Sequence, residues 1–320
     1  MIRARGWLGV VVGGAFGLTG CGTTPSASAI DSGVAADAAP RFVLAAHTDL
    51  SEGMLALRTN LPLRPADCLA LPDEGTPCAD ADADDLVDAW EDVFLDRFRP
   101  VLRFDEAEDL FDDPSSVMAI VGRVAPAMTG QHLRAFLTLG YSKDYGNCGL
   151  SSHNGDSERI AFDLEPLPGG GAGDVRAVQV YTAAHENTPN DHSRVFSGAD
   201  LALLEYAQDA ATGEPRWRVY SSENKHATYA TNAICDGVSV IPCFKESCSP
   251  DGVPEASAFE KVPVVWNAGE QALPRLTDLA PVGFPGDDAW LDQSFCGGLS
   301  RSATCAGSMR SKLVDDPFVL

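Results

Sequence analysis

Residues 153–164 read His-Asn-Gly-Asp-Ser-Glu-Arg-Ile-Ala-Phe-Asp-Leu. In the second half of this stretch, apolar residues alternate with other residues, which is typical of a half-buried strand. Similar runs recur along the chain and are separated by clusters of Gly, Pro, Asn and Asp. Many short runs of this kind predict a mainly β protein with an antiparallel β-sandwich. The expected strands span residues 41–46, 117–121, 135–141, 159–165, 175–181, 217–220 and 262–266.

The first half of the stretch carries a His-x-x-Asp-x-Glu motif, formed by His153, Asp156 and Glu158. We expect the strand to begin near Ser157. Both carboxylates then share one face at the rim of the sheet, because side chains two apart on a strand point the same way. Two carboxylates beside an imidazole suit a divalent metal. Polar residues before a strand are also ordinary turn residues, so the motif alone leaves both interpretations open.

The composition limits the classes of partner. The chain has 320 residues, of which 45% are hydrophobic, and its 23 basic and 46 acidic residues give a formal net charge of −23. It can therefore bury a sizeable core, in one large all-β domain or in two smaller ones. The negative charge argues against nucleic acid and anionic lipid as partners and favours the attraction of cations.

The N-terminus has the features of a bacterial lipoprotein signal. Two arginines precede an apolar run over residues 7–18, which is too short for a stable membrane span. The run ends in Leu18-Thr19-Gly20-Cys21, which looks like a lipobox and predicts removal of residues 1–20 and acylation of Cys21. We expect a lipid anchor to the cell envelope, at an outer membrane if there is one. An ordinary secretory signal is the alternative.

The rest of the chain divides by composition. Residues 21–40 are mostly small and polar and predict a flexible tether. Residues 41–79 form a loop-rich entry segment, since four prolines lie between residues 60 and 77. A calcium-type loop with its helix is expected over 80–100, followed by the β-sandwich domain over 101–320. Within this domain, residues 201–211 predict a short helix with Asp200 as its N-cap.

The cysteines indicate disulfides around a loop-rich periphery. Nine cysteines minus the acylated Cys21 leave eight, an even number that is typical of an exported, disulfide-bonded protein. A zinc site is the rival interpretation, but the chain has no CxxC pair. The local pairs we expect are Cys68 with Cys78, Cys243 with Cys248 or Cys235, and Cys296 with Cys305, and Cys148 completes the set.

An acidic segment has the spacing of a calcium loop. The first, third, fifth, ninth and twelfth positions of such a loop carry oxygen ligands, and a helix supplies the last of them. The sixth position, normally Gly, is Asp85, which tolerates a left-handed conformation at some cost. The matching residues are Asp80, Asp82, Asp84, Asp88 and Glu91.

The expected helix follows this segment. Its apolar residues recur at spacings of three and four, and Pro100 ends it. An alternative explanation for the acidic residues is the helix dipole, which favours carboxylates at an N-terminus. The apolar positions are Leu86, Val87, Trp90, Phe94 and Phe98.

Two further histidines lie just past the ends of expected strands. His185 follows the run that ends near Tyr181, and His226 follows the run that ends at Tyr220. Strand ends of an antiparallel sheet can meet at one edge, so these histidines could join His153 there. Solvated loop histidines are the alternative.

Several of these segments together resemble the vacuolar-protein-sorting family numbered sixty-two, in its bacterial lipoprotein form. The likeness covers roughly residues 80–300 and includes the calcium-type loop with its helix. The segments that carry it are 82–103, 153–158, 181–185, 225–229, 267–270 and 284–286.

A more distant resemblance is to the necrosis- and ethylene-inducing peptide-like proteins. Their motif ending in His-x-x-Asp-x-Glu builds a divalent-metal site at the edge of a β-sandwich, which binds sphingolipid head-group sugars. In this chain Ser157 replaces the Trp of that motif and Asn154-Gly155 replaces Arg-His, while the ligand set is intact. A mixed set of this kind suits calcium or magnesium better than structural zinc. The ligands that the resemblance implies are Asp144, His153, Asp156, Glu158, His185 and His226.

Three functions are compatible with these features. The first is a membrane-tethered, non-enzymatic protein that binds a glycan or lipid head group through the metal at its edge. The second is a metal-dependent hydrolase in which Asp144, His153 and Asp156 hold the ion and Glu158 or His226 acts as general base. The third is a structural envelope lipoprotein. No Gly-x-Ser-x-Gly motif supports covalent catalysis.

Overall fold

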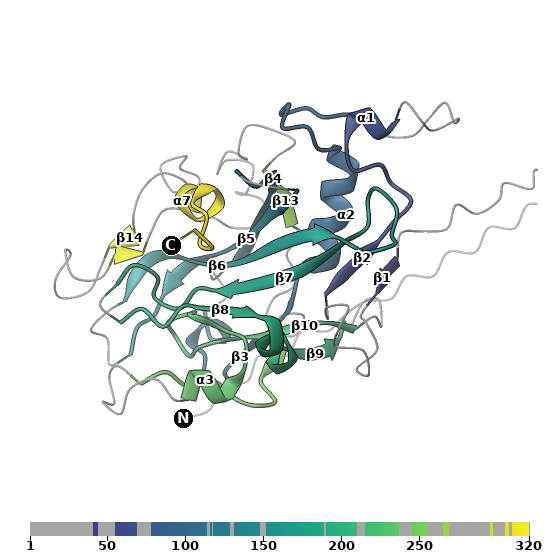
Figure 1. Ribbon diagram of the computed structural model, residues 1–320. Helices are drawn as coiled ribbons and strands as arrows, with labels where there is room; N and C mark the ends of the chain where they lie inside the picture. The colour runs from purple at the N-terminus through teal and green to yellow at the C-terminus, as the bar shows by residue number, and fades with distance from the viewer. Residues whose placement is uncertain are drawn as a thin grey trace, which may run out of the picture. The chain divides into compact units, whose positions relative to one another are not determined.

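Two β-sheets form the centre of the fold in the computed structural model (Figure 1). The larger sheet has eight strands in the order β1-β2-β7-β6-β5-β4-β13, with β8 beside β7. The smaller sheet has five strands in the order β11-β10-β3-β12, with β9 beside β10. Most neighbours are antiparallel, while β13 with β4 and β10 with β3 are parallel. The chain is therefore mainly β with few helices, as expected.

The strands vary in length from two residues to fourteen. The eight-stranded sheet contains β1 (Arg41–Val43), β2 (Ala56–Arg58), β4 (Met118–Pro126), β5 (Leu133–Asp144), β6 (His153–Pro166), β7 (Val175–Thr182), β8 (Arg194–Ser197) and β13 (Val265–Asn267). The five-stranded sheet contains β3 (Val101–Phe104), β9 (Glu205–Gln208), β10 (Pro215–Ser221), β11 (Thr228–Tyr229) and β12 (Val253–Pro254). A separate pair is formed by β14 (Phe295–Cys296) and β15 (Cys305–Ala306).

Among the described residues the helices are short, and the longest is α2. The α-helices are α1 (Pro65–Cys68), α2 (Asp88–Phe98), α3 (Asn232–Asp236) and α7 (Met309–Val314). Two 3₁₀ helices are η2 (Asp109–Phe111) and η3 (Gly198–Leu203). Within the part of the chain that the structure describes, no helix is both long enough and apolar enough to cross a membrane.

The structure describes only part of the chain. The predicted signal peptide (1–20) and tether (21–40) lie outside the described residues, as do Cys21, Cys148 and Cys243. The described residues are 41–43, 55–68, 78–113, 116, 118–128, 131–147, 152–188, 190–209, 215–236, 245–254, 265–268, 295–296, 305–306 and 309–319.

The β5–β6 pair is the longest strand pairing, and it carries the opening motif. Its register places Leu137 opposite Ile160 and Tyr141 opposite Asp156. Because side chains alternate along a strand, Ile160, Phe162 and Leu164 lie on the face that belongs to the main core, where all three are fully buried. The predicted alternation of this strand is therefore confirmed.

The two sheets pack against each other through aromatic side chains. Phe162 of β6 meets Trp217 of β10 edge to face, with 5.6 Å between the ring centroids. Phe104 of β3 meets Tyr141 of β5 in the same way at 6.3 Å. These contacts between the sheets make the arrangement a sandwich, and edge-to-face is a favourable geometry for aromatic pairs.

Helix α2 fills the core beside these strands, as the apolar spacing predicted. Phe98 meets Phe162 edge to face at 5.2 Å. The indole of Trp90 donates a hydrogen bond to the carbonyl oxygen of Gly173, at 2.9 Å, in the turn before β7. The helix ends at Phe98, two residues before Pro100.

Two local predictions are wrong. The motif strand begins at His153 instead of near Ser157, because β6 pairs with β5 along the whole motif, from Asp144 opposite His153 onward. The α-helix predicted from residue 201 onward is absent over the described residues 201–209. Instead η3 ends at Leu203 and Glu205–Gln208 form β9, which pairs with β10. Pairing with a neighbouring strand has outweighed local helix propensity there.

The disulfides agree with the predictions in part. Cys68 and Cys78 are bonded as expected. Cys235 of α3 is bonded to Cys248, so the expected pairing of Cys243 with either of them is wrong, because the turn into α3 brings Cys235 against the 245–250 segment. Cys296 and Cys305 lie opposite each other in the β14–β15 pair, and their bond stays a prediction.

Candidate functional site

Three aspartates of the calcium-type loop cluster around a common point. One carboxylate oxygen from each of Asp80, Asp82 and Asp84 lies within 4.8 Å of the others. This is the only group of three or more acidic, histidine or cysteine side chains with metal-binding spacing among the residues the structure describes. Carboxylate oxygens in this number are the ligands that calcium prefers.

The backbone of the loop is folded around these carboxylates. Asp80 accepts hydrogen bonds from the amides of Asp84 and Asp85 at 3.2 and 3.1 Å, and Asp84 accepts one from Leu86 at 2.9 Å. Asp85 has φ of 73°, so the sixth position adopts the left-handed conformation that usually requires Gly. The loop thus has the turn that the sequence pattern demands.

Glu91, from the first turn of α2, faces this cluster from the protein interior. Its side chain is fully buried, and neither carboxylate oxygen has a hydrogen bond of normal geometry or an ion pair with a described residue. Burial and the nearby charges of Asp84, Asp82 and Asp88 raise its pKa to about 9, against a smaller opposing effect of Asn267. A buried carboxylate without a counter-ion is costly, so Glu91 is either protonated or matched by a cation.

Helix capping does not explain these acidic residues. The N-cap of α2 is Val87, which offers no side-chain cap. Asp88 instead accepts a hydrogen bond from the amide of Ala81 at 3.0 Å and so closes the loop. Burial and the charge of Asp82 also raise the pKa of Asp84, to about 6, which is the response of crowded carboxylates that lack a cation.

The residues predicted for the edge site lie in and around β6. Asp156 and Glu158 share the face of β6 that points toward the smaller sheet, and both are buried. Asp144 is also buried and accepts a hydrogen bond from the amide of Gly146 at 2.6 Å. Its backbone partner across the sheet is His153, whose side chain lies outside the described part of the structure.

His226 lies between two carboxylates in the sandwich interior. Its Nε2 is 3.5 Å from Oε1 of Glu108, and its Nδ1 is 3.5 Å from Oδ2 of Asp156. The ring stacks on Tyr141, with 4.0 Å between the centroids. Burial alone would lower the pKa of this imidazole, but the two carboxylates raise it to about 10, so His226 is an imidazolium at neutral pH.

Glu158 is paired with a lysine from the C-terminal helix. The ammonium of Lys312 lies 3.6 Å from Oε2 of Glu158 and donates a hydrogen bond to the carbonyl oxygen of Ser157. Burial raises the pKa of Glu158 to about 7, and Lys312 opposes that rise. The charge of this carboxylate therefore depends on Lys312.

His185 faces a fourth buried carboxylate, that of Glu246. Its Nε2 lies 2.8 Å from Oε1 of Glu246, and the ammonium of Lys225 lies 3.6 Å from the same oxygen. Burial opposes the charged imidazole, but the hydrogen bond to Glu246 raises the pKa of His185 overall. Both His185 and His226 have positive φ, 58° and 57°, so their backbones hold them in a conformation that costs energy.

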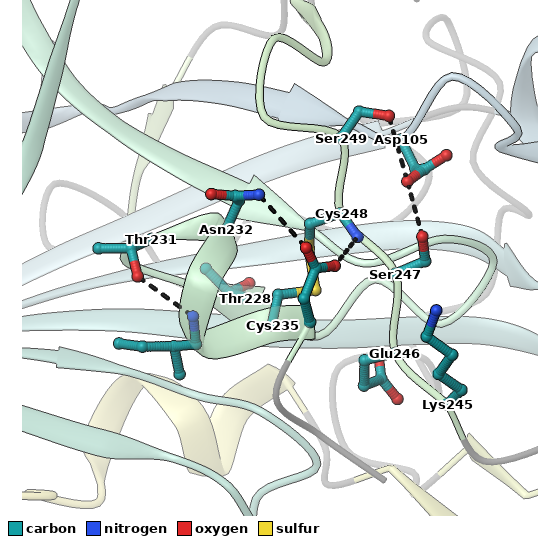
Figure 2. The surroundings of a disulfide bond; sticks show 12 residues. Asp105, Thr228, Thr231, Asn232, Cys235, Lys245, Glu246, Ser247, Cys248 and Ser249 are labelled. Atoms are coloured by element: carbon teal, nitrogen blue, oxygen red, sulfur yellow. Dashed lines mark hydrogen bonds between the residues drawn. A yellow bond between two sulfur atoms is a disulfide. The ribbon is translucent and has the colours of Figure 1, made fainter. Parts of the chain in front are cut away.

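The Cys235–Cys248 disulfide anchors the segment that carries Glu246 (Figure 2). The amide of Cys248 donates to Asp236 at 3.3 Å, and the hydroxyl of Ser247 donates to Asp105 at 3.1 Å. The chain on both sides of this glutamate is thus fixed to α3 and to the end of β3. The disulfide therefore positions the partner of His185.

Four buried carboxylates of this region face cationic side chains, and we call these carboxylates and their partners the interior charge network. Sequence reasoning identified His185, His226 and the two carboxylates of β6, but it missed Glu108, Glu246 and Lys312 as their partners. These three residues lie far from their partners in the sequence and carry no motif. Its members are Glu108, Asp156, Glu158, Glu246, His185, Lys225, His226 and Lys312.

Comparisons with known proteins give weak neighbours only. No family model and no curated protein matches the chain, so the resemblance to the vacuolar-protein-sorting family stays a prediction.

One similar solved structure is described as a toxin fold for microbial attack and plant defense. It has 14% identity and a TM-score of 0.27, and the match covers 60% of this chain and 90% of that chain. Two others are NLPPya in complex with glucosamine and with mannosamine, with identities of 14% and 13% and TM-scores of 0.28 and 0.27. Each of these two matches covers 61% of this chain and 91% of the other chain. These values assign neither a family nor a ligand to this chain.

Proposed function

We propose that this chain is an exported, lipid-anchored β-sandwich protein of the cell envelope that binds calcium through the loop from Asp80 to Glu91. The observation that carries the proposal is Glu91, a fully buried carboxylate that faces three clustered aspartates without a counter-ion among the described residues. A bound cation would neutralise this charge. The lipobox at Cys21 and the acidic composition support the location and the preference for cations.

Calcium fits the loop better than magnesium. The residues at positions one, three, five and twelve supply carboxylates, and position seven supplies the carbonyl of Leu86. Calcium accepts six to eight oxygen ligands in flexible geometry, whereas magnesium needs a near-ideal octahedron and keeps several waters. A crowded set of carboxylates with one inner glutamate matches the numerous, flexibly arranged oxygen ligands of calcium.

Calcium at this site would stabilise the whole sandwich. Glu91 belongs to the same helix as Trp90, Phe94 and Phe98, which pack into the core against β6. A ligand that binds only the folded loop would add its binding free energy to the stability of this helix and of the core that surrounds it. We therefore assign calcium a structural role.

The test is thermal unfolding of the full mature chain in calcium and in chelator. We expect calcium to raise the melting temperature by several degrees in the wild type, and Glu91→Gln and Asp80→Ala to lose most of this rise. The control is Asp92→Asn, because Asp92 is an exposed acidic residue of the same helix and should respond as the wild type does. An equal melting temperature of the wild type in calcium and in chelator would remove the proposal.

For the partner, we propose a glycan or lipid head group that binds near the loop carrying His185. This histidine is the member of the interior charge network with the most exposed side chain, at 21%. The hydrolase alternative has less support, because Glu158 and His226, its candidate bases, are buried and ion-paired. An imidazolium cannot accept a further proton.

Binding to glycan arrays and to vesicles of stated lipid composition tests this second proposal. The wild type should bind. His185→Ala removes one of the two cationic partners of Glu246 and should therefore lower the melting temperature, and it should weaken binding at a temperature at which the variant is still folded. Turnover of phosphoester or glycoside panels that is lost in Glu158→Gln would favour the hydrolase instead. No binding to any array or vesicle would contradict the head-group proposal.

A further inference from the structure

The C-terminal segment from Met309 to Phe318 lies over the outer face of the larger sheet. Leu313 is fully buried there, in a second apolar cluster that includes Ala161 of β6 and Tyr181 of β7. Phe318 packs against the same cluster, with its ring edge to face with Tyr181 at 6.5 Å. We call residues 309–318 the C-terminal strap.

Three arginines of the sheet hold the strap in place, of which Arg123 of β4 donates to the carbonyl oxygen of Leu313 at 3.5 Å. Arg159 of β6 donates to the carbonyl oxygens of Lys312 and Asp315. Arg134 of β5 pairs with Asp316 at 2.8 Å. Its guanidinium also lies 5.2 Å from the centre of the Phe318 ring. The strap is therefore fixed by apolar burial and by charge, along most of its length.

Lys312 reaches from the strap into the sandwich at one particular edge. Pairing of β7 with β6 ends at Thr182 opposite Ile160, so the motif half of β6 extends beyond it. The ammonium of Lys312 enters there, donates to the carbonyl oxygen of Ser157 and lies 3.6 Å from the carboxylate of Glu158. The side chain of Lys312 is only 6% exposed, which is exceptional for a lysine.

We propose that the ammonium of Lys312 occupies a cation position formed by Glu158 and the Ser157 carbonyl, and that the C-terminal strap closes this position to outside cations. A carboxylate oxygen and a backbone carbonyl are ligands that a hard divalent cation uses as well. The nearby carboxylate of Asp156 adds to the negative potential at Glu158. Removal of the lysine would leave Glu158 buried without its partner and would open the position to a divalent cation.

The experiment compares Lys312→Met with the double variant Lys312→Met/Glu158→Gln in the full mature chain. We expect the single variant to melt several degrees below the wild type in chelator. Calcium or manganese at millimolar concentration should then raise its melting temperature more than that of the wild type. In the double variant the melting temperature should recover, and the additional response to the cation should vanish. The calcium-type loop is intact in all three proteins, so its own response cancels in the comparison.

Lys245→Met is the matched control, because Lys245 is exposed, and it should behave as the wild type does. An unchanged melting temperature of Lys312→Met would overturn the proposal, as would an equal cation response in the single and double variants. If Lys312→Met does not fold, recovery of folded protein by Glu158→Gln supports the proposal. Failure of the double variant to fold as well would overturn it.

Discussion

The two acidic regions of this molecule differ in where their positive charge comes from. In the interior charge network, every buried carboxylate faces a lysine or a histidine of the chain itself. In the calcium-type loop, Glu91 and the clustered aspartates have no ion pair with a described residue, and Arg123 acts on Asp82 and Asp84 only at longer range. Acidic residues alone therefore do not indicate a metal site; the absence of internal counter-ions does.

Removal of a cation from the interior charge network should produce the largest effect. His226→Phe keeps an aromatic ring against Tyr141 but leaves Glu108 and Asp156 buried without their imidazolium. We expect the free energy of unfolding to fall by about 3–5 kcal/mol, the usual cost of breaking a buried ion pair on one side. Urea denaturation measures it. A loss below about 1 kcal/mol would mean that these carboxylates are compensated in another way.

Removal of a charge from the calcium-type loop should act in the opposite direction. Glu91→Gln takes away a buried carboxylate that has no counter-ion, so in chelator we expect the free energy of unfolding to rise by about 1–3 kcal/mol. The same urea titration in chelator measures it, with Asp92→Asn as the unchanged control. Destabilisation by Glu91→Gln in chelator would show that this carboxylate has a partner in the calcium-free protein.

The pH dependence of stability gives a smaller effect and should separate the regions further. The pKa of His226 rises from 6.5 to about 10 on folding. Its contribution to stability is thus fully present below about pH 6.5 and is lost as the pH rises toward about 10. In a Glu91→Gln background, we expect the free energy of unfolding to fall by at most about 1.4 kcal/mol between about pH 7 and pH 8. Urea titrations at both pH values measure it. The added change His226→Phe should flatten the slope, and a slope that survives it belongs to another group.

Local patterns of the sequence predicted much of the fold and the clustering of Asp80, Asp82 and Asp84, while calcium binding itself stays a prediction. The alternation of Ile160, Phe162 and Leu164 and the spacing of Trp90, Phe94 and Phe98 are short-range signals that correspond directly to buried faces. The loop is also local, because its ligand positions lie within twelve consecutive residues.

Lys312 and Glu246 could not be predicted as members of the network, because each lies far in the sequence from the residue that it pairs with. Lys312 is 154 positions from Glu158 (312 − 158), and no periodicity or motif marks it. Glu246 reaches His185 because the Cys235–Cys248 disulfide and hydrogen bonds to Asp236 and Asp105 hold its segment in place. The strand β9 escaped prediction for a related reason, since its conformation is set by pairing with β10.

The uncompensated charge of Glu91 also has a consequence for when the chain folds. If the protein is exported as we propose, it is synthesised where free calcium is scarce and is delivered to a place where calcium is plentiful. A core helix that carries an unneutralised carboxylate would delay folding before translocation, when an unfolded chain is easier to move across a membrane. Calcium outside the cell would then complete the core, so that a single glutamate makes the folded state conditional on arrival.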